Sequence, residues 1–439
     1  MAKVQTSFVC QECGYESPAF LGKCPECGMW NTLREFKVSP ASPVKQANSS
    51  LRSSVPLKLS EISQAQMKRL LTGFSEMDCV LGGGLVMGSV TLLAGDPGVG
   101  KSTLLLQMAL NMSVKKQDVL YISGEESQQQ VKLRATRLTK NLKNDSLFLV
   151  SSTNTDEAVS LIADNKPSVV IVDSIQTMES ENLTGLSGSV GQVRYGASEF
   201  IKLAKTLNIP TILVGHVTKE GMVAGPMVLS HMVDTVLFLE GEKNTGTRIL
   251  RSLKNRFGPV DEVGIFAMQG DGMIQITNPE QLFLTKGNNS PGSVLIANLE
   301  GTRAFLVEVQ ALCVFSKLPM PRRVASGIDY KRLELLLAVL QKHAHVPVEQ
   351  MDVFVNVAGG LKINDTACDL GICLAILSSV KNINLSKHVG IAEVGLLGEL
   401  RTPNFLDKRI KEARKLGLTK IITPKNYKTL AEVARILSK

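Results

Sequence analysis

The chain has 439 residues, more than one hydrophobic core efficiently supports, so at least two folded domains are expected. Hydrophobic residues make up 44% and charged residues 20%, a composition that excludes an intrinsically disordered chain. The formal net charge of +9 favours phosphate-bearing partners only weakly. The sequence shows neither the pattern of a signal segment nor a stretch near the roughly 20 apolar residues that cross a bilayer. We therefore expect a cytoplasmic protein without membrane contact.

Four segments follow one another along the chain. Residues 1–36 hold four of the eight cysteines, and residues 37–58 are rich in Ser, Pro and Lys, as is typical of a flexible linker. In residues 59–285 apolar runs alternate with amphipathic segments, which predicts an α/β domain with a mostly parallel sheet flanked by helices. Residues 286–439 show a second pattern of strands and helices and are expected to form an α+β domain.

Several elements are specific enough to be placed by residue number. A helix is expected from Asp329 to His343. The apolar runs predict strands at Val90–Leu93, Val119–Ile122, Leu147–Val150, Val169–Val172, Thr211–Val214, Val294–Leu299 and Ala304–Ala311. Four cysteines in apolar surroundings are interpreted as buried small hydrophobic residues: Cys79, Cys313, Cys368 and Cys373.

A metal site is predicted near the N-terminus, where two CxxC pairs lie ten residues apart and each is followed by glycine. The four cysteines are Cys10, Cys13, Cys24 and Cys27. A CxxC turn aims two thiolates at one point, and two such turns build a closed tetrahedral site that suits structural Zn²⁺. The alternatives are a redox dithiol or chance spacing, but a redox dithiol is usually a single CxxC that opens a helix.

A phosphate-binding loop is predicted between an expected strand and a helical run, where Gly95-Asp-Pro-Gly-Val-Gly-Lys101-Ser102 matches GxxxxGK[ST]. The glycines let the backbone wrap phosphates, Lys101 neutralises the β and γ charge, and Ser102 offers a hydroxyl to Mg²⁺. The residues expected to contact ATP and Mg²⁺ here are Gly95, Asp96, Pro97, Gly98, Val99, Gly100, Lys101, Ser102 and Thr103.

Two further acids follow apolar strands and complete the predicted ATP site. Asp173 ends the run Val169–Val172 and is expected to join the Mg²⁺ shell through water. Glu125 follows another strand and is our candidate for the group that orients the attacking water, with Glu126 in reserve. The alternative for this acidic pair is that both residues cap the following helix.

These motifs lead to a family resemblance that covers nearly the whole chain. Thr72-Gly-Phe-Ser-Glu-Met-Asp78, the glycines of Gly82–Gly84, the phosphate loop and Tyr121-Ile-Ser-Gly-Glu-Glu resemble the RecA superfamily core. The CxxC pairs, Lys254-Asn-Arg-Phe-Gly258 and Gly215-His-Val-Thr-Lys-Glu-Gly221 make the chain similar to the bacterial RadA (Sms) family of DNA repair proteins. The resemblance implies a RecA-like P-loop NTPase core.

The same resemblance implies a homo-hexameric ring that hydrolyses ATP and acts in recombinational DNA repair and the response to DNA damage. Single-stranded and branched DNA would be the substrates, branch migration the activity, and a RecA-type recombinase a partner. The resemblance also implies roles in ATP turnover and in the action on DNA for five consecutive residues, Lys254, Asn255, Arg256, Phe257 and Gly258. On an extended segment Lys254 and Arg256 share one face and reach a neighbouring subunit's γ-phosphate, whereas solvated surface charge is the alternative.

DNA contact is expected on two loops that leave the predicted sheet. The first runs from Ile175 to about Gly196 and the second from Val217 to Val228. Between them, His216 at a strand end is either a sensor of the γ-phosphate or simply a packed side chain.

The C-terminal segment resembles the proteolytic domain of Lon proteases, which use a Ser nucleophile and a Lys base. In this chain Ala367 stands at the nucleophile position and Asp407, followed by Lys408, at the base position, so a non-proteolytic domain is predicted. Cys368 is a conceivable substitute nucleophile, but its apolar surroundings favour a core residue. The basic residues expected to contact DNA phosphates are Lys317, Arg322, Arg323, Lys408, Arg409, Lys411, Arg414 and Lys415.

Three functions are therefore weighed against one another. A DNA-stimulated ATPase motor uses every motif above. A nucleotide-gated regulator of the same superfamily would act on protein partners instead of DNA, and an ATP-dependent protease would need the missing Ser–Lys pair.

Overall fold

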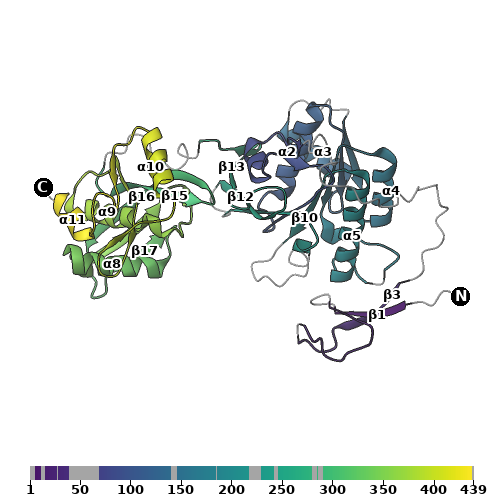
Figure 1. Ribbon diagram of the computed structural model, residues 1–439, viewed down its shortest axis with the longest axis horizontal. Helices are drawn as coiled ribbons and strands as arrows, with labels where there is room; N and C mark the ends of the chain where they lie inside the picture. Colours follow the sequence, from purple (N-terminus) through teal and green to yellow (C-terminus); the bar gives the residue numbers. More distant parts are fainter. Residues whose placement is uncertain are drawn as a thin grey trace, which may run out of the picture. The chain divides into compact units, whose positions relative to one another are not determined.

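The computed structural model describes residues 5–10, 15–26, 28–38, 69–139, 146–183, 185–216, 229–241, 246–278, 284 and 290–437. The chain divides into two compact units, each of which is described by itself below (Figure 1). The first unit comprises residues 1–241, 248–260 and 266–275, and the second comprises residues 242–247, 261–265 and 276–439. From residue 39 onward the expected linker lies outside the described residues.

A nine-stranded sheet forms the centre of the first unit, and its strand order is β14-β13-β12-β11-β6-β10-β9-β7-β8. Six neighbouring strands are parallel: β11 (Thr235–Glu240), β6 (Val90–Gly95), β10 (Thr211–His216), β9 (Val169–Asp173), β7 (Val119–Ser123) and β8 (Leu147–Ser151). The five strands predicted in this part of the chain are confirmed. At one edge the sheet continues with β12 (Thr247–Asn255), antiparallel to β11, and with the hairpin of β13 (Val263–Gln269) and β14 (Gly272–Gln275).

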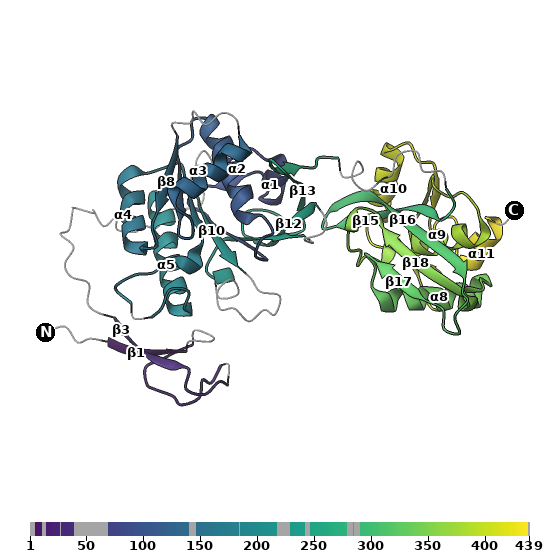
Figure 2. The same ribbon diagram turned by 180° about the vertical axis from the view of Figure 1, so that it is seen from behind.

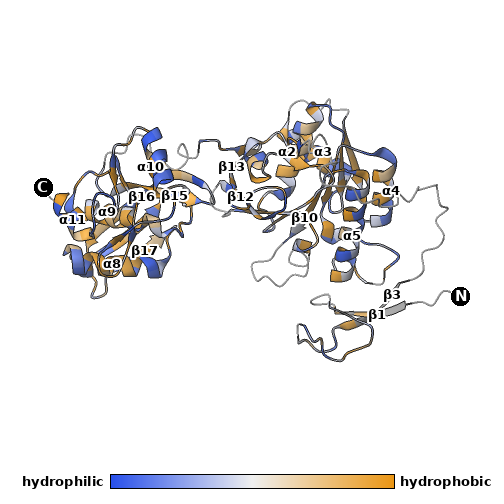
Figure 3. Cartoon of the chain, viewed as in Figure 1, coloured by the Kyte–Doolittle hydropathy of each residue, from blue (hydrophilic) through white to orange (hydrophobic). Residues whose placement is uncertain are grey.

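Helices cover both faces of this sheet, which explains why its strands read as continuous apolar runs. The side chains of Val169 and Ile171 join a core with α2 (Lys101–Val114) and α3 (Gln128–Leu138). The alternate residues Val170 and Val172 join the opposite core with α4 (Thr155–Asn165) and α5 (Val190–Leu207). Figures 1 and 2 show the two helical layers, and Figure 3 shows apolar residues gathered along the sheet between them.

Shorter elements complete the first unit. The helix α1 (Ser75–Val80) precedes the sheet, the strands β4 (Arg69–Leu70) and β5 (Leu85–Val86) pair with each other, and the 3-10 turn η3 (Ile175–Thr177) follows β9. A separate three-stranded sheet near the N-terminus has the order β2-β1-β3, with bounds Glu16–Ser17, Gln5–Cys10 and Leu33–Val38.

The second unit is built on a six-stranded mixed sheet of order β17-β18-β16-β15-β19-β22. Its strands are β17 (Arg323–Ser326), β18 (Met351–Val357), β16 (Arg303–Phe315), β15 (Ser293–Glu300), β19 (His388–Gly390) and β22 (Lys420–Ile422), and the short strands β20 (Glu393–Val394) and β21 (Leu400–Arg401) pair separately. The helices are α8 (Tyr330–Ala344), α9 (Asp369–Lys381), α10 (Leu406–Lys415) and α11 (Leu430–Ile436), with 3-10 turns η4 (Val348–Gln350), η5 (Ala358–Gly360) and η6 (Thr366–Cys368). The two strands and the helix predicted here are confirmed as β15, β16 and α8.

Two expectations about individual residues need correction. Cys368 and Cys373 are buried as predicted, but Cys79 is exposed and Cys313 is only partly buried. Cys79 differs because it lies on the outer side of the short helix α1, whose Met77 and Val80 supply the buried side.

The first predicted loop is also shorter than expected, because α5 already begins at Val190 and therefore includes Arg194 and Gly196. An added Cβ at Gly196 would lie 3.3 Å from the hydroxyl of Thr155, so this glycine serves close helix packing rather than a loop. Among the described residues, no helix has the length and apolar character needed to cross a membrane.

Candidate nucleotide-hydrolysis site

The register of the parallel strands brings four strand ends to one edge of the large sheet. Gly95 at the end of β6 lies opposite His216 at the end of β10, and Ser123 at the end of β7 lies opposite Asp173 at the end of β9. In open α/β sheets, ligands bind in the crevice beyond the carboxyl ends of the strands. The predicted nucleotide residues therefore meet where a ligand is expected.

The phosphate loop joins the end of β6 to the start of α2, and its glycines are required by the geometry. Gly100 has a φ of 109°, and an added Cβ there would lie 2.3 Å from the terminal methyl of Met273. Gly95 passes so close to β11 that its Cβ would lie 2.3 Å from the carbonyl oxygen of Leu239. Among the described residues no side chain caps the N-terminus of α2, so its first N–H groups are available to phosphate oxygens.

Lys101 is held inside this loop by main-chain carbonyl oxygens. Its side chain is 3% exposed, and its Nζ donates to the carbonyl oxygens of Gly95 at 2.8 Å and Asp96 at 3.1 Å. Burial lowers the pKa of Lys101, and the negative charges of Asp173, Glu125 and Asp96 oppose this shift. A cation enclosed by carbonyl oxygens can exchange them for the β- and γ-phosphate oxygens.

Asp173 is positioned by a partner that the sequence analysis did not single out. The hydroxyl of Tyr121, on the neighbouring strand β7, donates to Asp173 Oδ2 at 2.5 Å. Tyr121 is fully buried, and its burial together with the carboxylate of Asp173 raises the pKa of Tyr121 well above the ordinary value. The phenol therefore stays protonated and remains a donor, which fixes the orientation of the Asp173 carboxylate.

The structure gives the adjacent acids Glu125 and Glu126 different surroundings, which distinguishes the two candidates for water activation. Glu125 Oε1 accepts from Ser174 Oγ at 2.7 Å and lies 3.2 Å from His216 Nε2, so this carboxylate faces the strand ends. Glu126 instead pairs with Arg134 at 2.8 Å. Neither acid caps the following helix, because Ser127 is the N-cap of α3 and forms a capping box with Gln130.

A buried arginine also supports the phosphate loop and was missed by the sequence analysis. Arg248 of β12 is 6% exposed, and its Nε donates to the carbonyl oxygen of Val99 at 3.0 Å. Its position eight residues after Glu240 gave no motif by which it could be found.

Lys254 and Arg256 lie at the opposite edge of the sheet from Lys101. Because β12 is antiparallel to β11, Asn255 pairs with Thr235, whereas Leu239 pairs with Gly95. The two edges are four residues apart along β11, or about 13 Å. This placement keeps both cations away from the nucleotide site of their own chain.

Each of the two cations has partners at that edge. Lys254 Nζ donates to the carbonyl oxygens of Ser230 at 2.7 Å and Val233 at 2.8 Å. Arg256 forms an ion pair of 3.1 Å with Asp234, a residue that is 4% exposed, while the Arg256 side chain itself is 53% exposed. Arg256 is thus both oriented and accessible.

The two predicted DNA loops are only partly visible. After η3, the first of them covers residues 178–189, of which residue 184 lies outside the described residues. The second loop, Val217 to Val228 with Lys219, lies entirely outside them.

The N-terminal sheet brings two of the predicted metal ligands together. Cys10 and Cys24 are both fully buried and share one cluster with Leu33. Their turns close in the same way, because Cys10 N donates to Tyr15 O and Cys24 N donates to Met29 O, each at 2.9 Å. Cys13 and Cys27 lie outside the described residues. Matched turns around paired thiols fit the donor set that Zn²⁺ requires.

The two positions at which Lon proteases carry their catalytic pair hold neither serine nor lysine in this chain, and they differ in burial. Ala367 is 1% exposed, whereas Asp407 is exposed and accepts from Lys425 Nζ at 2.6 Å. A pocket of about 300 Å³ lies between η6 and the start of α10, and the described residues that line it include neither serine nor lysine. Burial raises the pKa of Cys368 well above the ordinary value, which agrees with its interpretation as a core residue.

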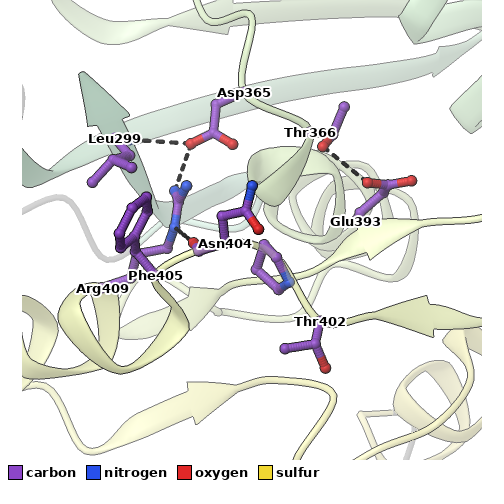
Figure 4. Close-up of a pocket in the computed structure, with 9 residues that line it drawn as sticks. Leu299, Asp365, Thr366, Glu393, Thr402, Asn404, Phe405 and Arg409 are labelled. Atoms are coloured by element: carbon purple, nitrogen blue, oxygen red, sulfur yellow. Dashed lines mark hydrogen bonds and ion pairs between the residues drawn. The ribbon is translucent and has the colours of Figure 1, made fainter. Parts of the chain in front are cut away.

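Figure 4 shows that the guanidinium of Arg409 is directed at Asp365 in this pocket, where Nη1 and Oδ2 are 2.5 Å apart. Arg409 Nη1 also donates to the carbonyl oxygen of Ala297 at 2.6 Å, and the residue is 2% exposed. The expectation that Arg409 contacts DNA phosphates is therefore wrong, because its guanidinium is buried and paired with Asp365.

A phosphate loop that enters a helix from one strand of a mostly parallel sheet, with carboxylates at the ends of neighbouring strands, is the arrangement of a P-loop ATPase. Residues 56–222 match the family model of the AAA domain, residues 8–35 that of the rubredoxin metal binding domain, and residues 331–427 that of subunit ChlI of Mg-chelatase.

Full-length relatives give the family. The proteins named DNA repair protein RadA from Bacillus subtilis (strain 168) and Pseudomonas aeruginosa are each 46% identical to the chain, over 429 and 427 residues. The protein of that name from Streptococcus pyogenes serotype M1 is 45% identical over 431 residues. Each alignment covers 97% of this chain and 93% or 94% of the relative. The chain belongs to the RadA family of DNA repair proteins.

The N-terminal cysteine cluster generates a first prediction. Cys24→Ser should remove bound zinc and expose the N-terminal residues to protease, because so short a module has little apolar area to fold without metal. Zinc content by mass spectrometry and limited proteolysis measure the two effects, with Cys79→Ser as a matched control at an exposed cysteine. A Cys24→Ser protein that keeps zinc at the wild-type ratio contradicts the site.

Proposed function

We propose that the chain is a DNA-dependent ATPase that processes recombination intermediates, by moving along single-stranded and branched DNA during repair. The observation that carries this proposal is the convergence of Lys101, Asp173 and Glu125 at one sheet edge, in a chain whose relatives are named DNA repair proteins.

Each group at the edge has a separate task in the proposed hydrolysis of ATP. Lys101 and the N-terminus of α2 stabilise the negative charge of the β- and γ-phosphates. Ser102 and Asp173 would hold Mg²⁺, which neutralises phosphate charge when bound. Glu125 orients the attacking water and accepts its proton, since its carboxylate is accessible and directed into the site.

Assembly into a ring, proposed to be a homo-hexamer, would complete this site. Lys254 and Arg256 are about 13 Å along the sheet from the loop of their own chain. Their charge is therefore useful to a triphosphate only if a neighbouring copy presents its phosphate edge to them. The accessible guanidinium of Arg256 suits the γ-phosphate of that neighbour.

Contact with DNA is proposed for the loops that follow β9 and β10 and for the exposed basic residues of the C-terminal unit. The two loops leave the same edge that holds the nucleotide, so changes at the phosphates reach them over short stretches of chain. The proposal includes a structural Zn²⁺ on Cys10, Cys13, Cys24 and Cys27, a RecA-type recombinase as partner, and a C-terminal unit without proteolytic activity.

ATP turnover titrated with single-stranded, duplex and forked DNA tests this function. Turnover should rise with single-stranded or forked DNA, and the rise should weaken with salt because phosphate contacts release counterions. Turnover that is indifferent to DNA but changes with protein partners would favour a nucleotide-gated regulator. ATP-dependent digestion of casein would show that the C-terminal unit is a protease.

The two acids after β7 should behave very differently. Glu125→Gln should lower kcat at least about 100-fold, because an amide cannot accept the proton of the attacking water. Glu126→Gln is the matched control, since Glu126 pairs with Arg134, and it should stay within about 3-fold of wild type. Steady-state turnover with saturating Mg²⁺·ATP measures both, and the reverse order of effects would assign the role to Glu126.

Arg256 should act on the neighbouring subunit's ATP. Arg256→Ala should lower kcat about 1000-fold or more while each chain still binds ATP, because arginine fingers act on the transition state. Mixing this variant with Lys101→Ala tests the direction of action, since the mixture creates some sites with both groups intact. Activity that rises above both pure variants supports action between subunits, and activity equal to their average contradicts it.

A further inference from the structure

Two donors from neighbouring strand ends hold the carboxylate of Glu125. We infer that Ser174 and His216 are positioning residues that fix Glu125 for water activation, an inference that rests on the role proposed above for Glu125. Both donors meet the same oxygen, Oε1, at 2.7 Å from Ser174 Oγ and 3.2 Å from His216 Nε2. Among the described residues both of these contacts are made to Oε1, and Oε2 is the oxygen that we assign to the water molecule.

Ser174 is built into the edge as a fixed donor. It is fully buried, and it directly follows Asp173 at the end of β9. Its carbonyl oxygen accepts from Thr177 N at 3.3 Å and from Thr177 Oγ1 at 2.8 Å, which fixes the backbone from which its hydroxyl projects. A buried hydroxyl directed at a carboxylate restricts the rotamers of the acid at little entropic cost of its own.

Gly124 lets Glu125 come this close to Ser174. The N–H of Gly124 donates to the carbonyl oxygen of Asp173 at 2.9 Å, so the chain after β7 stays attached to β9. An added Cβ at Gly124 would lie 2.0 Å from Thr177 Oγ1, a distance that no side chain tolerates. The close approach of the two strand ends therefore depends on glycine, and it places the next residue, Glu125, over Ser174.

His216 contributes the second donor from the end of β10. Its side chain is 32% exposed, and its main-chain carbonyl accepts from Gln176 Nε2 at 3.3 Å. Because β10 lies between β9 and β6, His216 reaches Glu125 from the side of the phosphate loop. Serine and histidine thus hold the acid from two directions, whereas His216 was predicted to be either a phosphate sensor or a packed residue.

The two donors should raise kcat rather than strengthen ATP binding, because they touch Glu125 and neither one lies in the phosphate loop. A hydrogen bond to a charged group changes rates or affinities about 10- to 100-fold. Ser174→Ala should therefore lower kcat about 10- to 100-fold and leave KM for ATP within about 2-fold. Ser174→Thr keeps the hydroxyl and should recover most of the rate.

Ser151→Ala is the matched control. Ser151 ends the parallel strand β8, which lies beside β7, and its hydroxyl donates to the main-chain oxygen of Glu126 at 3.1 Å rather than to a catalytic carboxylate. Its kcat should equal that of wild type. Wild-type kcat in Ser174→Ala, or equal losses in Ser174→Ala and Ser151→Ala, overturns the inference.

His216 provides an independent arm in case Ser174→Ala folds poorly, because His216 is partly exposed and tolerates change more readily. His216→Ala should lower kcat with little change in KM, and His216→Gln, which keeps an N–H donor near the position of Nε2, should recover part of it. A His216→Ala protein with wild-type kcat overturns the part played by histidine.

Combination with Glu125→Gln separates this inference from the role of Glu125 itself. In a Glu125→Gln background Ser174→Ala should cause no further loss, since both changes remove one function. Full additivity shows that Ser174 acts elsewhere and contradicts the inference. Wild-type turnover in Glu125→Gln alone overturns the proposed role of Glu125, an outcome distinct from any failure of the serine or histidine variants.

Discussion

Four parallel strands end level with one another, and among the described residues Lys101, Glu125 and Asp173 lie at those ends or in the segments that follow them. The level ends follow from backbone register, with Gly95 opposite His216 and Ser123 opposite Asp173. Slipping one strand by a single residue would turn its side chains to the other face. Burial of both faces of the sheet fixes that register, so the apolar cores on each side determine the geometry of the site.

The same register assigns the remaining charged groups to different surfaces. The antiparallel strand β12 has one end at the phosphate edge, where Arg248 contacts Val99, and the other at the opposite edge, where Arg256 meets Asp234. One strand thus supports the site of its own chain and carries the cations proposed for the site of a neighbour. In the C-terminal unit the buried Arg409 forms an ion pair with Asp365 of the same unit, so its charge is not available to a ligand.

Sequence reasoning succeeded where a motif follows from local chemistry. Apolar runs in the sequence predicted the strands β6 to β10 and the position of Asp173 at the end of β9. The motif between a strand and a helix predicted the phosphate loop. Partners such as Tyr121 and Ser174 were not predicted, because they act on residues 52 and 49 positions away along the chain and no local pattern marks them. Cys79 was predicted to be buried but is exposed, because the orientation of α1 decides which side of that helix is covered. Arg409 was predicted to be exposed but is buried, because it pairs with Asp365, which is 44 residues away along the chain.

Fluorescence anisotropy of a labelled single strand tests most directly whether the strand edge controls the grip on DNA. The hydrolysis-deficient Glu125→Gln chain should bind the strand more tightly with Mg²⁺·ATP than with Mg²⁺·ADP or without nucleotide, because the γ-phosphate orders the groups at the edge from which the loops depart. Equal affinity in all three nucleotide states, at low ionic strength, would contradict the coupling on which this account is based.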